Sequence, residues 1–165
     1  MKKRNVFLIV IFIIGIVLDQ WTKGLVANNM NLFESIEIIP GFFSITYAQN
    51  TGAAWSMMEG QMLFFYVITI VAFVLLVFYL KNLKEGQFLS KLGVIMMLSG
   101  TIGNFMDRVM FQYVRDFLDF IIFGYDFPIF NVADSFLCVG VAIILLEEFM
   151  DYYKVGAKWK QKDIQ

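Results

Sequence analysis

Four long apolar runs dominate the pattern of hydrophobic and polar positions along this 165-residue chain. Crossing about 30 Å of hydrocarbon takes roughly 20 apolar residues in a helix. The runs therefore predict four membrane-spanning helices, at about 6–26, 62–80, 92–111 and 130–150. Little chain remains between them, so we expect a single membrane domain over 1–165, with residues 151–165 as a cytoplasmic tail.

The connection at about 28–60 has a different pattern. Ile36–Ile39 and Phe42–Tyr47 are short runs of β-branched and aromatic residues on either side of Pro40-Gly41. Such runs around a turn favour a β-hairpin, and we expect this small β-cradle to lie on the membrane interface. The predicted fold class is an all-α polytopic membrane protein with a small extracytoplasmic β-hairpin.

Lysine and arginine predict the orientation, because they accumulate in cytoplasmic loops. Basic residues precede the first span, separate the second from the third and follow the fourth, whereas 28–60 contains none. Both termini are therefore expected in the cytoplasm, with 28–60 and the 112–129 connection outside.

The segment Asp19–Lys23 lacks the small residues of a signal-peptide cleavage site, so the first helix is expected to stay attached. The composition, 59% hydrophobic and 18% aromatic, is typical of a membrane protein.

The polar stripes within the spans gather at their outer ends, and none is expected at an inner end. Asp19 and Lys23 stand four residues apart, acid before base, which favours a helical ion pair. The third span carries residues at three- and four-residue steps: Gly100, Asn104, Asp107, Arg108 and Phe111. Asn131 and Asp134 repeat this spacing in the fourth span. Ionisable groups at membrane depth are costly and indicate function, so we expect one site beneath the outer surface.

Asp116 and Asp134 fall at the same end of two different spans and form the candidate catalytic pair. The chain has no histidine and one cysteine, which excludes the zinc-protease motif, the Ser-His-Asp triad and the Cys-His dyad. Cys138 is interpreted as a buried apolar residue. Two close carboxylates share one proton, because like charges at short range do not both ionise cheaply. The protonated acid then protonates the substrate while the ionised acid takes a proton from water.

Five short blocks then stand out by their order and spacing. They are Asp19-Gln20-Trp21-Thr22-Lys23, Asn50-Thr51-Gly52-Ala53-Ala54-Trp55, Gly100-Thr101-Ile102-Gly103-Asn104-Phe105-Met106-Asp107-Arg108, Asp116-Phe117 and Phe130-Asn131-Val132-Ala133-Asp134-Ser135. The blocks resemble those of lipoprotein signal peptidases, the bacterial type II signal peptidases, which are intramembrane aspartyl proteases. The similarity runs from about Val6 to Met150.

The resemblance implies roles for individual residues and a substrate. It assigns Asp116 and Asp134 as the catalytic dyad, with Asn104, Arg108 and Asn131 around them and Asp19, Lys23, Asn50 and Gly52 as further pocket positions. It implies removal of signal peptides from diacylglyceryl-modified prolipoproteins, on the amino side of the lipidated cysteine, without metal or organic cofactor. The implied partners are lipidated prolipoproteins and membrane lipids, with no nucleic acid. A monomer in the bacterial inner or cytoplasmic membrane is expected.

Arg115 departs from the family, which commonly has valine before this aspartate. Consecutive side chains of an extended segment point to opposite sides, so we expect Arg115 at the headgroup level, as an interfacial anchor. The alternative is that Arg115 pairs with Asp116 and favours its ionised form.

Two other functions remain open at this stage. Tyr125-Asp126 resembles the Tyr-Asp motif of presenilin-like and prepilin peptidases, although the chain has no Gly-x-Gly-Asp. A small proton-coupled transporter or channel subunit also accommodates intramembrane charges, but polar stripes confined to one end leave no path across the bilayer.

Overall fold

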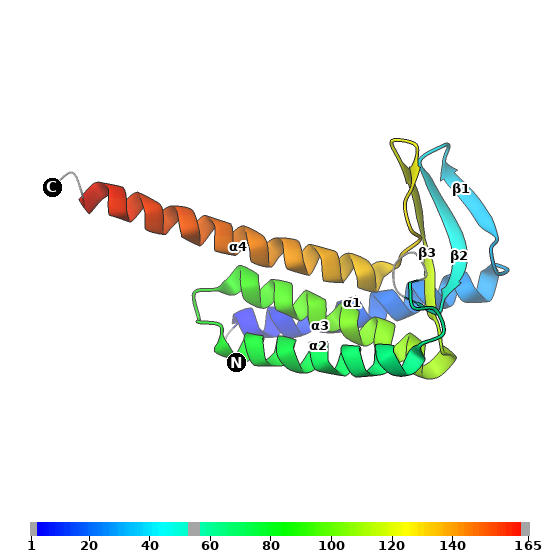
Figure 1. The fold of residues 1–165 in the computed structure, drawn as a ribbon, viewed down its shortest axis with the longest axis horizontal. Coiled ribbons are helices and arrows are strands. Elements are labelled where there is room, and N and C mark those ends of the chain that lie inside the picture. The colour runs from blue at the N-terminus through cyan, green and yellow to red at the C-terminus, as the bar shows by residue number, and fades with distance from the viewer. Residues whose placement is uncertain (1–2, 53–56, 163–165) are drawn as a thin grey trace.

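The computed structural model describes residues 3–52 and 57–162, with side chains as far as Tyr153. In this part of the chain, four helices form a bundle and a β-sheet lies at one end of it (Figure 1). The helices are α1 (Lys3–Asn29), α2 (Met62–Asn82), α3 (Phe88–Phe111) and α4 (Val132–Lys162). The start of α1 and the C-terminal end of α4 both point away from the sheet.

The helices expose apolar side chains and bury polar ones. Leu63 on α2 is 76% exposed, whereas Asp19 and Lys23 on α1 are 1% and 0% exposed. Among the described residues, α1, α2 and α3 are long and apolar enough to cross a membrane. An extended apolar surface of this kind suits contact with lipid. The first three predicted spans fall within these helices, and α4 contains most of the fourth.

The sheet is larger than the predicted hairpin. Its strands follow the order β1-β2-β3-β4 and pair antiparallel. They are β1 (Ser35–Ile39), β2 (Phe43–Asn50), β3 (Val114–Ile122) and β4 (Tyr125–Asp126). The hairpin around Pro40-Gly41 is confirmed. The all-α class is wrong in one respect, because the expected loop between the third and fourth spans supplies two of the four strands.

The turn after α3 places β3 against β2. Gln112 ends the helix in the left-handed conformation, with φ 66°, and its N–H donates to the carbonyl of Arg108 at 3.1 Å. The chain then enters β3, where Asp116 lies opposite Ala48 of β2. Asp116 therefore belongs to a strand rather than to the end of a membrane span.

Glycines let α3 and α4 pack closely. A Cβ on Gly93 would lie 2.5 Å from the carbonyl oxygen of Gly140, and a Cβ on Gly140 would lie 2.5 Å from that of Gly93. Small residues permit such backbone approach between membrane helices. The close packing brings the polar residues of the two helices within hydrogen-bonding distance.

One buried acid lies at the opposite end of the bundle from the sheet, contrary to the prediction that polar groups occur only at outer ends. Glu147 on α4 is 8% exposed. Its carboxylate accepts hydrogen bonds from the backbone N–H groups of Leu89 and Ser90, at 3.3 and 2.7 Å. These N–H groups begin α3 and have no partner within their own helix. Glu147 therefore caps α3 from a neighbouring helix.

Candidate active site

Asp134 is positioned by the start of α4. Asn131 immediately precedes the helix, and its Oδ1 accepts a hydrogen bond from the backbone N–H of Asp134 at 3.0 Å. In return, Asp134 Oδ2 accepts from the backbone N–H of Asn131 at 3.2 Å. This reciprocal arrangement is a capping box, in which two otherwise unpaired backbone donors are satisfied. The local sequence Asn-x-x-Asp thus fixes the position of the carboxylate.

Asp116 approaches Asp134 from the sheet. Asp116 Oδ1 accepts a hydrogen bond from Asn131 Nδ2 at 2.6 Å, and Oδ2 accepts from Asn50 Nδ2 at 3.0 Å. Asn131 therefore contacts both acids, through its side chain on one side and its backbone on the other. Asn50 comes from β2, so the sheet supplies one acid and one of its donors.

Asn104 of α3 completes the set of amide side chains around the two acids. Its Nδ2 donates to Asp134 Oδ1 at 2.7 Å, while its Oδ1 accepts from Asn131 Nδ2 at 3.1 Å. Each carboxylate oxygen of both acids thus accepts a hydrogen bond from a neutral donor. Neutral donors orient a carboxylate without pairing it with a cation.

Both acids line a cavity of about 660 Å³. Its wall includes apolar residues of α2 and α4 as well as Phe127–Phe130. Arg108 also lines it, donating to the carbonyl of Gly52 at 3.2 Å, with its guanidinium carbon 4.8 Å from the centre of the Phe65 ring. The cavity is large enough for a segment of a ligand, and it brings that ligand against the two acids.

The surroundings of Asp116 change its acidity. Asp116 is 2% exposed. Burial, together with the nearby Asp134 carboxylate, raises the pKa of Asp116 to about 7, although the hydrogen bonds from Asn50 and Asn131 and the Lys23 charge act in the opposite direction. A raised pKa keeps a proton on this pair of acids closer to neutral pH than an ordinary carboxyl group would, and acid–base hydrolysis uses such a shared proton.

The predicted site residues divide into two groups. Most line the cavity, namely Asp116, Asp134, Asn50, Gly52, Asn104 and Arg108. Asn131 is fully buried beneath the two acids. Asp19 and Lys23 are also fully buried and lie outside the described cavity wall. Ala53, Ala54 and Trp55, from the second sequence block, lie outside the described residues. Cys138 is exposed and lines the cavity, so its interpretation as a buried residue is wrong.

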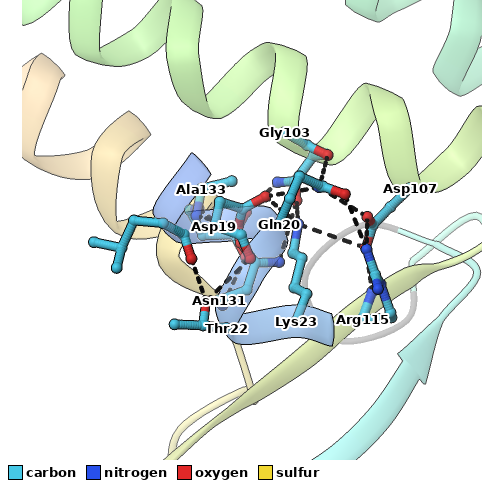
Figure 2. Close-up of polar contacts among 12 residues, drawn as sticks. Asp19, Gln20, Thr22, Lys23, Gly103, Asp107, Arg115, Asn131 and Ala133 are labelled. Carbon is cyan, nitrogen blue, oxygen red and sulfur yellow. Dashed lines mark hydrogen bonds and ion pairs between the residues drawn. The ribbon is translucent and has the colours of Figure 1, made fainter. Parts of the chain in front are cut away.

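Asp19 and Lys23 form a buried ionic cluster with Asp107 and Arg115 (Figure 2). Lys23 Nζ lies 2.9 Å from Asp19 Oδ2, which confirms the predicted ion pair. Arg115 lies in the same cluster, 8% exposed, with its Nη2 2.7 Å from Asp107 Oδ1. The prediction of an interfacial anchor is therefore wrong. The alternative pair with Asp116 is also wrong, because α3 supplies the partner.

The predicted site residues do not include Gln20 and Asp107, although the sequence blocks contain both and both join the buried ionic cluster. Gln20 Nε2 donates to Asp107 Oδ1 at 3.0 Å, and its Oε1 accepts from Arg115 Nη2 at 3.0 Å. Asp107 follows Asn104 by one helical turn, and that spacing places it in the polar stripe of the third span. Among the described residues, no three histidine, cysteine, aspartate or glutamate side chains gather to hold a metal ion.

The comparisons with known proteins agree with this geometry. The family model described as Signal peptidase (SPase) II matches residues 11–150, which contain both acids and all their hydrogen-bond partners. The chain belongs to the signal peptidase II family. The transporter and the presenilin-like alternatives are therefore set aside.

Several relatives of the signal peptidase II family match almost the whole chain. The protein of Bacillus pumilus (strain SAFR-032), named lipoprotein signal peptidase, is 49% identical over 157 residues, covering 94% of this chain and 97% of its own. That of Staphylococcus haemolyticus (strain JCSC1435), with the same name, is 45% identical over 154 residues, covering 92% and 97%. The Bacillus subtilis (strain 168) protein is 48% identical over 133 residues, covering 81% and 86%.

Two solved structures share the fold. One, described as a bacterial membrane enzyme, has a TM-score of 0.81 at 40% identity and covers 88% of this chain and 89% of its own. A second, with the same description, has a TM-score of 0.76 at 41% identity and covers 86% and 91%. The combination of helix bundle and sheet is thus that of a bacterial membrane enzyme.

Proposed function

We propose that this protein removes signal peptides from lipid-modified prolipoproteins. Membership of the signal peptidase II family and the shared name of the relatives, lipoprotein signal peptidase, support this function. The single observation in the site that carries it is the pair Asp116 and Asp134 on the wall of one cavity, each oriented by neutral amide donors. The substrate bond is the one on the amino side of the lipidated cysteine.

Asp116 and Asp134 act as one acid–base unit that holds a single proton. The ionised carboxylate takes a proton from the attacking water, and the protonated one donates to the peptide group, so no covalent intermediate forms. Asn50, Asn104 and Asn131 keep the two carboxyl groups in place by the hydrogen bonds described above. Neither a metal ion nor an organic cofactor takes part in this scheme.

The membrane arrangement of the proposed enzyme has four spans, with α4 as the fourth. Exposed apolar side chains along α4, such as Leu145, Leu146 and Phe149, support contact with lipid. The distribution of lysine and arginine supports cytoplasmic termini, a single membrane domain over 1–165 and a cytoplasmic tail at 151–165. The sheet end, and with it the dyad, then lies near the outer face, where a lipid-anchored substrate meets water.

Lipidated prolipoproteins and membrane lipids are the proposed partners, and the proposed state is a monomer. A substrate held by acyl chains reaches the cavity from within the bilayer, because apolar side chains of α2 and α4 line the cavity.

Substitution of single acids tests the dyad. Asp116→Asn and Asp134→Asn should each abolish cleavage of a lipid-modified precursor by the purified enzyme, because an amide keeps the shape but does not carry the shared proton. Asp119→Asn, in the same strand, and Asp126→Asn, in β4, are matched controls that should retain activity. Substantial cleavage by either dyad variant would remove that aspartate from the catalytic role.

The lipid requirement needs a second experiment. A precursor with the same peptide sequence but no diacylglyceryl group should be cleaved poorly, because its acyl chains no longer hold it at the dyad. Equal turnover of the lipidated and unlipidated precursors would indicate a general peptidase with a water-facing groove.

A further inference from the structure

The buried ionic cluster behind the dyad is electrically balanced. It contains two acids, Asp19 and Asp107, and two bases, Lys23 and Arg115, contributed by α1, α3 and β3. All four are buried, at 1%, 0%, 0% and 8% exposure respectively. Buried charges are costly unless they are paired, so the loss of any one of them leaves an uncompensated charge close to the dyad.

Lys23 joins the buried ionic cluster to the dyad through Asn104. Its Nζ donates to Asn104 Oδ1 at 2.9 Å and lies 2.9 Å from Asp19 Oδ2. An ammonium group has only donors, so the amide atom that faces it has to be the oxygen. The amide nitrogen of Asn104 then faces the other way and donates to Asp134 Oδ1 at 2.7 Å. The orientation of Asn104 toward the dyad thus depends on Lys23.

Arg115 neutralises the charge of Asp107. Asp107 Oδ2 accepts from the backbone N–H of Arg115 at 2.9 Å and from its Nε at 3.1 Å, while Oδ1 accepts from Nη2 at 2.7 Å. Lys23 Nζ stays at 3.6 Å from Asp107, farther than from Asn104. Without Arg115, Lys23 would be the nearest cation to a buried Asp107. Coulomb attraction at short range would then draw the ammonium away from Asn104.

We propose that Lys23 is a positioning residue for the catalytic dyad, which fixes the Asn104 amide toward Asp134, and that Arg115 keeps Lys23 on Asn104 by neutralising Asp107. The inference rests on the proposed function, because it concerns the same two acids. Lys23 itself lies outside the described cavity wall, so it acts through Asn104 rather than on the substrate.

Charge changes in the buried ionic cluster are expected to reach the dyad. The charged groups that act on Asp116 and Asp134 come from two helices: Lys23 and Asp19 on α1, and Arg108 on α3. Removal of one cation from the balanced cluster adds a net negative charge, which favours the protonated form of a nearby acid. The pH–rate profile therefore distinguishes loss of charge balance from loss of packing.

The test replaces Arg115 by methionine, which keeps bulk and removes the charge. With full-length enzyme in detergent micelles and a lipid-modified precursor, Arg115→Met should lower kcat about tenfold, leave KM within about twofold and move the pH–rate profile to higher pH. The double variant Arg115→Met with Asp107→Asn restores the balance of charge, and it should recover most of the kcat and return the profile to its original position.

Two results would overturn the role of Arg115. One is an Arg115→Met enzyme with an unchanged pH–rate profile. The other is a double variant whose activity is no better than that of the single variant, which is the expectation if Arg115 only holds β3 in place.

A second variant tests Lys23 without changing Arg115. The test therefore still works if the Arg115 variants fail to fold. Asp19→Asn with Lys23→Met removes one charge of each sign, and asparagine still accepts the hydrogen bond that Asp19 Oδ1 receives from the backbone N–H of Ala133 at 2.9 Å. This enzyme should lose kcat and keep its KM. A raised KM with full kcat would place Lys23 in the substrate site and overturn the proposal. A failure of the proposed function can be distinguished from a failure of this inference, because the unmodified enzyme would then not cleave the precursor.

Discussion

The replacement of Asp116 by asparagine should make the protein increasingly stable, relative to the unmodified enzyme, as the pH rises, while it removes the activity. Asp116 is 2% exposed, and burial with the neighbouring Asp134 raises its pKa from 3.8 to about 7. The folded protein therefore bears the cost of a poorly solvated carboxylate whenever Asp116 is ionised. An amide of the same shape does not ionise, so the variant does not bear this cost.

The sign of the pH dependence follows from proton uptake. Between pH 3.8 and about pH 7 the folded state keeps a proton that the unfolded state has released, so the free energy of unfolding falls as the pH rises through this window. The fall is complete above the folded-state pKa. A rise of about 3 pKa units, at about 1.36 kcal/mol per unit, corresponds to an upper limit of about 4 kcal/mol. The two acids titrate together, so this slope belongs to the pair.

The Asp116→Asn substitution also introduces an effect that does not depend on pH. Both oxygens of Asp116 accept hydrogen bonds from amide nitrogens, those of Asn50 and Asn131. In the variant, the new amide nitrogen would face one of these donors, and an unpaired buried donor costs about 1–3 kcal/mol. The change in stability with pH, rather than the stability at one pH, therefore reports the titration.

The assay is denaturation in detergent micelles from about pH 4 to about pH 8, followed by tryptophan fluorescence. The stability of Asp116→Asn relative to the unmodified protein should rise over this range and then level off. Asp119→Asn, in the same strand, controls for the substitution itself. If the stabilities of the Asp116→Asn variant and the unmodified protein ran parallel over the whole range, burial would not govern the acidity of Asp116.

Two further predictions concern the bundle rather than the site. Gly93→Ala should destabilise the protein by about 1–3 kcal/mol, because its Cβ would lie 2.5 Å from the Gly140 carbonyl oxygen, whereas Gly24→Ala, in open space, should be neutral or slightly stabilising in the same denaturation assay. Glu147→Ala should cost about 1 kcal/mol of stability by uncapping α3 while kcat stays unchanged, and Glu148→Ala, at the neighbouring exposed position, is its control.

The helices and the first hairpin could be predicted from the sequence because their signals are local. A run of roughly 20 apolar residues favours a membrane helix whatever lies elsewhere in the chain, and the observed α1, α2 and α3 each contain the predicted span. The Asn131–Asp134 spacing is likewise local, since a capping box involves residues within one turn. Residue types and the resemblance predict the two acids as the dyad without knowledge of the sheet.

The tertiary structure alone decided where the remaining polar groups find partners. β3 (Val114–Ile122) owes its conformation to pairing with β2, which lies far earlier in the chain, and pairing between distant segments leaves little trace in either one. Strand alternation does place Arg115 on the opposite side from Asp116. Alternation does not determine what lies on that side. There, Arg115 meets Gln20 of α1 and Asp107 of α3 instead of lipid headgroups. Periodicity determines the direction of a side chain, whereas long-range packing determines what it meets.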